Sequence, residues 1–236
     1  MRSQRNQSVD WQQQFQILQA QAEDARLRSY YSEELPEQTT PLADAPLVAL
    51  DLETTGLDPD QSEIVSIGLV PFSTQRVYLR DYRHWVVKPR KPMSEDSILI
   101  HGITHSDVES APSFDAVFEQ LLGALASKIV VVHCRSIEQE FLNRRCLQIT
   151  GETLKLPIID TMEIERRALE GRRGALDKLL RRPLGSLRLA DARKRYSLPA
   201  YQAHHALTDA IATAELLQAQ LAYHYRPDTP VRDLWV

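Results

Sequence analysis

Two acidic residues stand close together at the end of an apolar run. Asp51 and Glu53 follow residues 47–50, four apolar residues that predict a short buried strand. Side chains alternate along a strand, so Asp51 and Glu53 point to the same side. Neighbouring carboxylates repel each other and cost free energy unless a cation or a proton neutralises them. The pair therefore indicates either a cation site or a half-exposed strand with two solvated acids.

Further acids follow other apolar segments. Glu138 lies on a predicted helix after a second apolar strand, and Asp209 lies early in the last helix, shortly after His204 and His205. Asp209 alone could be an acid that interacts favourably with the helix dipole. Together, acids from three separate elements could converge on a hard cation. Ligation by oxygen alone suits Mg²⁺ or Mn²⁺, whereas structural zinc prefers Cys and His.

An alternation of strands and helices positions these acids. Three strands follow one another with short connections, which predicts an antiparallel meander, and helices alternate with strands after them. This order predicts an α/β domain with a mixed sheet covered by helices. The predicted strands are residues 47–50, 64–70, 76–87, 129–132 and 156–160. The predicted helices are residues 113–126, residues 137–147 and a final helix that begins near residue 207.

The first 45 residues differ from the rest in composition. The stretch Gln7–Tyr31 predicts one amphipathic helix, and the prolines after it predict a linker or extended arm. This helix packs on the domain itself, docks a protein partner or belongs to a disordered tail; the sequence leaves these alternatives open. The organisation expected is an N-terminal helix and linker over 1–45, a domain over 46–225 and a C-terminal tail over 226–236.

The composition limits the cellular compartment and the kinds of ligand that can be expected. The chain has 236 residues, a formal net charge of −4 and two cysteines, and it has no apolar run long enough for a membrane helix. A reduced, cytoplasmic setting without a membrane partner is expected. Residues 165–195 contain eleven Lys or Arg but four Asp or Glu. This basic segment is either a solvated helix surface or a contact for phosphates.

Three strings of residues resemble motifs of one enzyme family. Val48–Leu57, which reads Val-Ala-Leu-Asp-Leu-Glu-Thr-Thr-Gly-Leu, resembles the first motif of the DnaQ-like, or DEDDh, 3′→5′ exonucleases. His101–Thr104 is similar to the His-Gly-Ile-Thr element of this family, and residues 204–210 are similar to its third motif, His-x-Ala-x-x-Asp-Ala. The resemblance covers roughly residues 46–222. It implies a ribonuclease H-like mixed sheet of five strands flanked by helices.

The second motif departs from the family pattern. The family has His-Asn-Ala-x-Phe-Asp-x-x-Phe-Leu, whereas residues 133–142 read His-Cys-Arg-Ser-Ile-Glu-Gln-Glu-Phe-Leu. The shared Phe-Leu fixes the register, so Glu138 takes the place of the second aspartate. The carboxylate is kept but is one methylene longer. Activity could therefore be retained, weakened or shifted towards Mn²⁺.

The resemblance also implies roles for individual residues. Two ions, Mg²⁺ or Mn²⁺, would be held by Asp51, Glu53, Glu138 and Asp209. His204 would be the general base, because the family places this base five residues before the aspartate; the neighbouring His205 is then a solvated surface residue. The residues expected to contact substrate are Thr54, Thr55, Leu57, His101 and Ile103. For His101, a hydrogen-bonded core histidine is the alternative.

The expected reaction is metal-dependent 3′→5′ hydrolysis of nucleic acid, with release of nucleoside monophosphates. Single-stranded DNA or a DNA 3′ end is favoured as the partner, and RNA is the further candidate. Two alternatives stay open on the sequence alone. One is a nuclease-like binding module with weakened catalysis, and the other is a polymerase-associated subunit whose exonuclease activity is secondary.

Overall fold

A five-stranded mixed sheet forms the centre of the computed structural model, which describes residues 9–174, 180 and 183–235. The strand order is β3-β2-β1-β4-β5. β1 pairs antiparallel with β2 and parallel with β4, β2 pairs antiparallel with β3, and β4 pairs parallel with β5. The predicted mixed sheet is therefore confirmed. The strands are β1 (Leu47–Thr54), β2 (Ile64–Phe72), β3 (Arg83–Val86), β4 (Ile129–Val132) and β5 (Ile158–Asp160).

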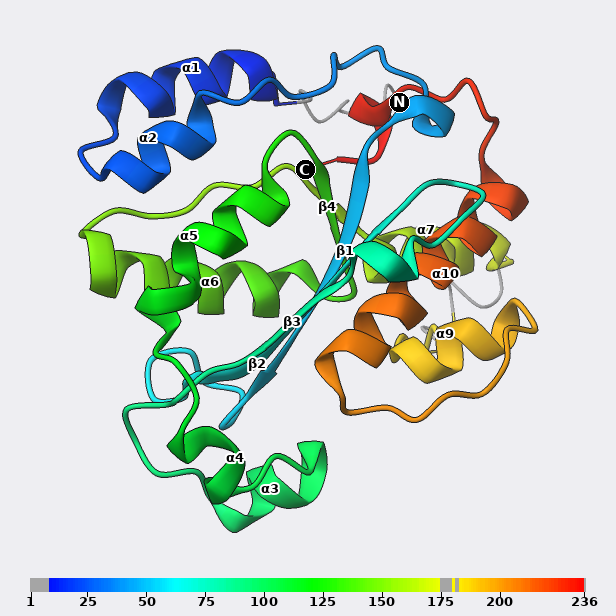
Figure 1. Ribbon diagram of the computed structural model, residues 1–236. Coiled ribbons are helices and arrows are strands. Elements are labelled where there is room, and N and C mark those ends of the chain that lie inside the picture. The colour runs from blue at the N-terminus through cyan, green and yellow to red at the C-terminus, as the bar shows by residue number, and fades with distance from the viewer. Residues whose placement is uncertain (1–8, 175–179, 181–182, 236) are drawn as a thin grey trace.

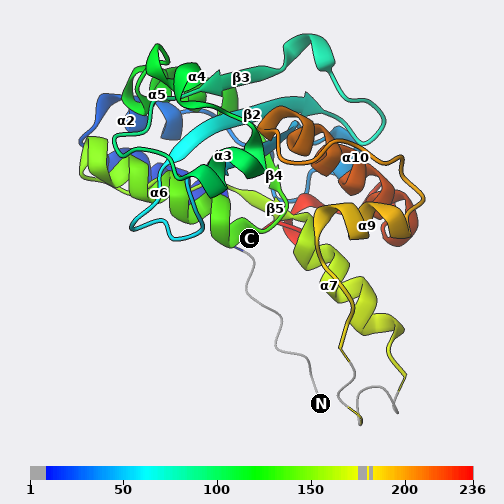
Figure 2. The same ribbon diagram turned by 90° about the horizontal axis from the view of Figure 1, so that it is seen from below.

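Helices cover both faces of this sheet (Figure 1). The helices α5 (Phe114–Leu125) and α6 (Arg135–Thr150) lie on one side. On the other side lie α7 (Thr161–Arg172), α9 (Leu189–Arg195) and α10 (Ala206–His224), which group together in Figure 2. The short helices α3 (Glu95–His101) and α4 (His105–Glu109) follow β3 beyond one end of the sheet. The third strand is shorter than residues 76–87 because a 3₁₀ turn (Leu79–Asp81) interrupts that segment.

A glycine allows α10 to begin directly on the sheet. Gly68 on β2 pairs with Asp51 on β1. A Cβ atom at position 68 would lie 2.3 Å from backbone atoms of Ala206 and Leu207, far inside van der Waals contact. Only glycine permits so close an approach of two backbones. The start of α10, and with it Asp209, is therefore placed beside the acidic end of β1.

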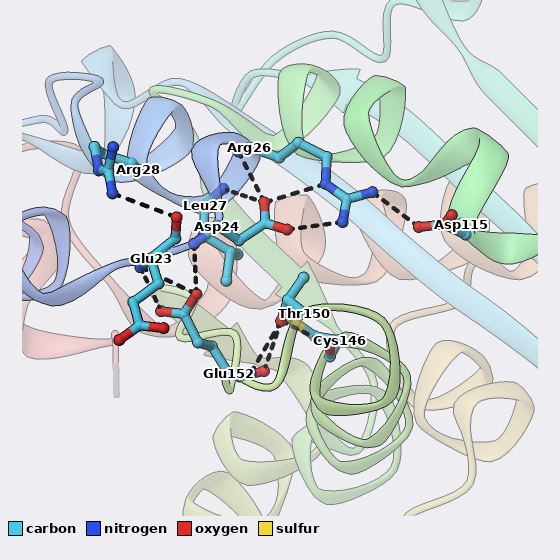
Figure 3. A network of polar contacts seen from close by, with 9 residues as sticks. All are labelled: Glu23, Asp24, Arg26, Leu27, Arg28, Asp115, Cys146, Thr150 and Glu152. Carbon is cyan, nitrogen blue, oxygen red and sulfur yellow. Dashed lines mark hydrogen bonds and ion pairs between the residues drawn. The ribbon is translucent and has the colours of Figure 1, made fainter.

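The single helix expected over Gln7–Tyr31 is wrong, because the described part of this stretch forms two helices, α1 (Trp11–Gln21) and α2 (Ala25–Tyr31). The break has a local cause: the Asp24 side chain accepts hydrogen bonds from the first backbone N–H groups of α2. The Glu152 carboxylate, which follows α6, accepts from the backbone N–H groups of residues 23 and 24 (Figure 3). Arg26 adds an ion pair to Asp115 on α5.

Both ends of the described chain pack into the main core. Trp11, Phe15 and Tyr30 from the first two helices are buried there. Residues 226–235, which belong to the expected C-terminal tail, pack back on the domain, because Val231 and Trp235 are buried in the same core. Their apolar side chains gain more from burial than an exposed tail would offer. The apolar faces of α1 and α2 are thus occupied by the chain itself.

No helix in the described ranges is both long and apolar enough to span a bilayer.

Candidate active site

Three carboxylates meet where β1 and α10 touch. Asp51 and Glu53 are alternate residues of β1, so they share the face of the sheet that α10 covers. Asp209 lies in the first turn of α10. One ligand oxygen from each of the three lies within 4.8 Å of the others. Three of the four acids expected to converge are therefore close together, and they fit the donor set of a hard divalent cation.

The three acids carry charge that the protein does not neutralise. In the described part of the chain, no Lys or Arg forms an ion pair with any of them. Burial, together with the charges of Asp209, Glu138 and Glu53, raises the pKa of Asp51 well above its usual range. Burial and the charge of Asp209 raise the pKa of Glu53 to about 7. Such a cluster favours a proton or a cation.

Glu138 lies beside this cluster but outside it. The group of three close carboxylates in the described residues does not include Glu138. Its side chain on the first turn of α6 is only 4% exposed, and one carboxylate oxygen, Oε2, is buried with no hydrogen-bond partner among the residues that the structure describes. Burial raises its pKa well above the ordinary value. An unsatisfied buried carboxylate is costly, so this oxygen also fits a site for a cation.

The backbone before α10 is hydrogen-bonded to the side chain of Asp209. One oxygen of its carboxylate, Oδ2, accepts hydrogen bonds from the backbone N–H groups of His204 at 2.7 Å and His205 at 3.1 Å. The other oxygen, Oδ1, accepts from the hydroxyl of Tyr201 at 2.7 Å. His204 has a φ of 69°, which is uncommon for a residue other than glycine. The position of the candidate base is thus tied to that of a candidate metal ligand.

The two adjacent histidines have different surroundings. The His204 side chain is exposed and lines a pocket of about 350 Å³ with Leu99, His101 and Gly102. His205 also borders this pocket, but its Nδ1 caps α10 by accepting from the backbone N–H of residue 208. Its ring lies 4.8 Å from that of His84. His205 therefore has structural contacts that the expectation of a merely solvated residue did not include.

The candidate substrate residues surround the site in different ways. Leu57 is 83% exposed and free to contact a ligand, whereas the hydroxyls of Thr54 and Thr55 hydrogen-bond within the turn after β1. His101 is buried with both ring nitrogens bonded: Nδ1 accepts from the backbone N–H of Ile103, and Nε2 lies 2.7 Å from the hydroxyl of Ser97. His101 thus has the partners of a core histidine while it lines the pocket.

Sequence reasoning assigned no role to Asp160, which holds two helices in place. Its carboxylate accepts from the backbone N–H groups of Cys134, Arg135 and Met162. It therefore caps α7 and fixes the start of α6, the helix that carries Glu138. The signal available in the sequence was an acid directly before a helix at the end of an apolar strand.

Several arginines of the basic segment form ion pairs within the protein. Arg166 and Arg167 form ion pairs with Glu163, and Arg195 pairs with the buried Glu165. These arginines have acidic partners on the protein itself, which neither the solvated surface nor the phosphate contact expected from the sequence included. Arg181 and Arg182, which also belong to the segment, lie outside the described residues.

The raised pKa of Glu53 predicts a pH-dependent loss of stability in the metal-free protein. The folded state favours the protonated Glu53 carboxyl. The contribution of this group to the free energy of unfolding is therefore greatest below pH 4.5, the ordinary pKa, and is lost as pH rises through about 7. Glu53→Gln cannot ionise. The melting temperature of this variant minus that of wild type, both in EDTA, is therefore expected to grow from pH 5 to pH 8.

The subtraction removes the opposite contribution of buried histidines, whose pKa values burial lowers and which are common to both proteins. A difference that stays constant over this range would contradict the prediction.

The chain is similar to known proteins over most of its length. The family model described as "Exonuclease" matches residues 48–217. The chain is 32% identical over 173 residues to a DNA polymerase III of PolC type from Thermotoga maritima. That match covers 73% of this chain but only 12% of the longer protein. It is 28% identical to the DNA polymerase III subunit epsilon of Rickettsia prowazekii, covering 73% of this chain and 72% of the relative.

Solved structures share the fold. Exonuclease X in complex with 5′ overhanging duplex DNA has a TM-score of 0.57 at 24% identity, covering 75% of this chain and 92% of that one. The nuclease domain of 3′hExo, described as a DEDDh family member bound to rAMP, has a TM-score of 0.60 at 17% identity, covering 76% and 92%. The ribonuclease H-like architecture expected from the motifs is confirmed. With its match to the Exonuclease family model over residues 48–217, and with relatives named as DNA polymerase III of PolC type and DNA polymerase III subunit epsilon, the chain belongs to the DnaQ-like exonuclease family and is an exonuclease.

Proposed function

We propose that this exonuclease is a divalent-metal-dependent enzyme that removes nucleotides from the 3′ end of single-stranded DNA. The observation that carries the proposal is the convergence of Asp51, Glu53 and Asp209 within 4.8 Å, with His204 hydrogen-bonded to Asp209 through its backbone. The names of the relatives support DNA as the substrate, and a further structural neighbour is E. coli Exonuclease I in complex with a dT13 oligonucleotide.

The residues present fit two divalent ions, Mg²⁺ or Mn²⁺. Asp51, Glu53 and Asp209 would hold them, and Glu138 would contribute its unsatisfied oxygen directly or through a water molecule. When bound, such ions supply neutralisation of the scissile phosphate and lower the pKa of attacking water. The repulsion among the carboxylates is relieved at the same time.

The remaining roles fall to side chains around the pocket. The exposed imidazole of His204 would take the proton from water, because an imidazole can accept a proton near neutral pH. The pocket beside it would receive the terminal nucleotide. Leu57 and Leu99 are each 83% exposed and would offer apolar surface to bases. Apolar contacts of this kind do not depend on base identity, which suits an enzyme that degrades any sequence.

The decisive experiment determines which end of the substrate is attacked. Single-stranded DNA and RNA oligomers of the same sequence, labelled at the 5′ end, are incubated with purified protein and Mg²⁺ or Mn²⁺. A descending ladder of 5′-labelled products and release of nucleoside monophosphates are expected, with faster digestion of DNA. Label released first as a mononucleotide would contradict the 3′→5′ direction. Binding without cleavage of either oligomer would favour a nuclease-like binding module.

Glu138→Asp is expected to retain or increase the rate of digestion. The substitution restores the shorter acid that the family has at this position and keeps the charge beside Asp51. Rates with Mg²⁺ and Mn²⁺ should be measured for wild type, Glu138→Asp and Glu138→Gln. The Gln variant, which has the wild-type length without the charge, is expected to be slower than both. A large loss in Glu138→Asp together with unchanged activity in Glu138→Gln would show that Glu138 plays no part in cation binding.

A further inference from the structure

Tyr201 makes a contact that neither the motifs nor the comparisons assign. Its hydroxyl donates a hydrogen bond of 2.7 Å to Asp209 Oδ1, from a loop that precedes α10. Among the described residues, the side chains of Asp51 and Glu53 form no hydrogen bond with other protein groups, whereas both oxygens of Asp209 are bonded. Asp209 is thus the one acid of the three whose orientation the protein fixes on both sides.

The position of Tyr201 is itself held by a buried arginine. The guanidinium carbon of Arg193 on α9 lies 4.9 Å from the centre of the Tyr201 ring. Arg193 is 3% exposed and donates to the carbonyl oxygens of Pro199 at 3.1 Å and Ala212 at 2.8 Å. It also forms an ion pair of 2.8 Å with Glu215. These contacts attach the loop that carries Tyr201 to the middle of α10.

We propose that Tyr201 is a positioning residue for metal binding, an inference that rests on the proposed function. Its hydroxyl fixes the carboxylate plane of Asp209, and Arg193 fixes Tyr201. A carboxylate torsion is otherwise broad, and repulsion from Asp51 and Glu53 favours rotation away from them. With the Tyr201 bond in place, Asp209 faces the other two acids before a cation arrives, so less conformational freedom is lost on binding.

The competing explanation is that Tyr201 only fastens a loop. In that case its hydroxyl contributes to stability and has no particular effect on cation affinity. The chain provides a matched comparison in Tyr196, whose hydroxyl donates at 2.8 Å to the carboxylate of Glu165. This second tyrosine–carboxylate pair lies between α7 and α9, and its acid does not belong to the group of three.

The test compares Tyr201→Phe with Tyr196→Phe by direct cation binding. Metal-free protein is titrated with Mn²⁺ and bound ion is measured by electron paramagnetic resonance, without substrate. Tyr201→Phe is expected to weaken Mn²⁺ binding by about 10-fold or more, the usual effect of losing a partner of a ligand. Tyr196→Phe is expected to bind Mn²⁺ as wild type does, even where its melting temperature in EDTA falls.

A second measurement distinguishes weaker cation binding from a general loss of stability in Tyr201→Phe. This variant keeps the aromatic ring that packs against Arg193. The rise in melting temperature on adding Mn²⁺ is expected to be smaller for Tyr201→Phe than for wild type and Tyr196→Phe. Equal Mn²⁺ affinity and an equal rise in wild type and Tyr201→Phe would overturn the role of Tyr201 and leave the proposed function intact. Absence of Mn²⁺ and Mg²⁺ binding by wild type would instead overturn the metal dependence, and the role of Tyr201 with it.

Discussion

Asp51→Asn is expected to abolish digestion and to make the metal-free protein more stable. Asn keeps the size of the side chain but removes a charge that lies beside Asp209, Glu138 and Glu53. Loss of one carboxylate weakens cation binding by more than the ~100-fold seen for partners of metal ligands, so turnover falls below detection. The same change removes repulsion, so the melting temperature in EDTA rises.

Digestion assays and thermal melting with EDTA or Mg²⁺ check both parts of this expectation. Wild type is expected to gain stability when Mg²⁺ is added, whereas Asp51→Asn gains little. Asp81→Asn is the control, because Asp81 is an exposed acid in the 3₁₀ turn before β3 and does not belong to the group of three carboxylates. Undiminished digestion by Asp51→Asn would refute its role as a metal ligand.

His204→Asn is expected to lower kcat by roughly 10²–10⁴-fold, the usual contribution of a general base. Asn has no group that can take a proton near neutral pH. It tolerates a positive φ better than most residues, so the backbone at 69° and its N–H bond to Asp209 are kept. Mn²⁺ binding is accordingly expected to stay close to that of wild type.

His205→Asn is the matched control for this variant. Asn is a good helix cap, so α10 should keep its N-terminal hydrogen bond while the contact of His205 with His84 is lost. Its kcat is expected to remain within a few-fold of wild type. A greater loss of kcat in His205→Asn than in His204→Asn would assign the base to His205 instead.

The sequence predicted those parts of the fold whose signals are local. Residues 129–132 are four β-branched residues and form the fully buried strand β4, and the apolar periodicity after residue 207 marks α10. The alternation of Asp51 and Glu53 placed both on one face of β1. Their proximity to Asp209 was expected from the family resemblance, because pairing between distant segments has no local signal.

Contacts between segments far apart in the sequence determine the features that the sequence did not predict. The break between α1 and α2 arises where Asp24 caps a new helix and Glu152 binds the backbone before it. Tyr201 has no spacing that links it to Asp209, and only the folded loop brings its hydroxyl there. The register of the second motif likewise did not show that Glu138 would lie near Asp51 without joining the group of three acids.

The assembly of the site from distant segments has a consequence during protein synthesis. Asp51 and Glu53 leave the ribosome early, whereas Asp209 joins them only after the intervening segments have been translated and α10 has docked on β1 and β2. A nascent or misfolded chain therefore lacks the complete set of carboxylates. Under the proposed function, hydrolysis of nucleic acid would therefore begin only after folding has brought Asp209 to the other two acids.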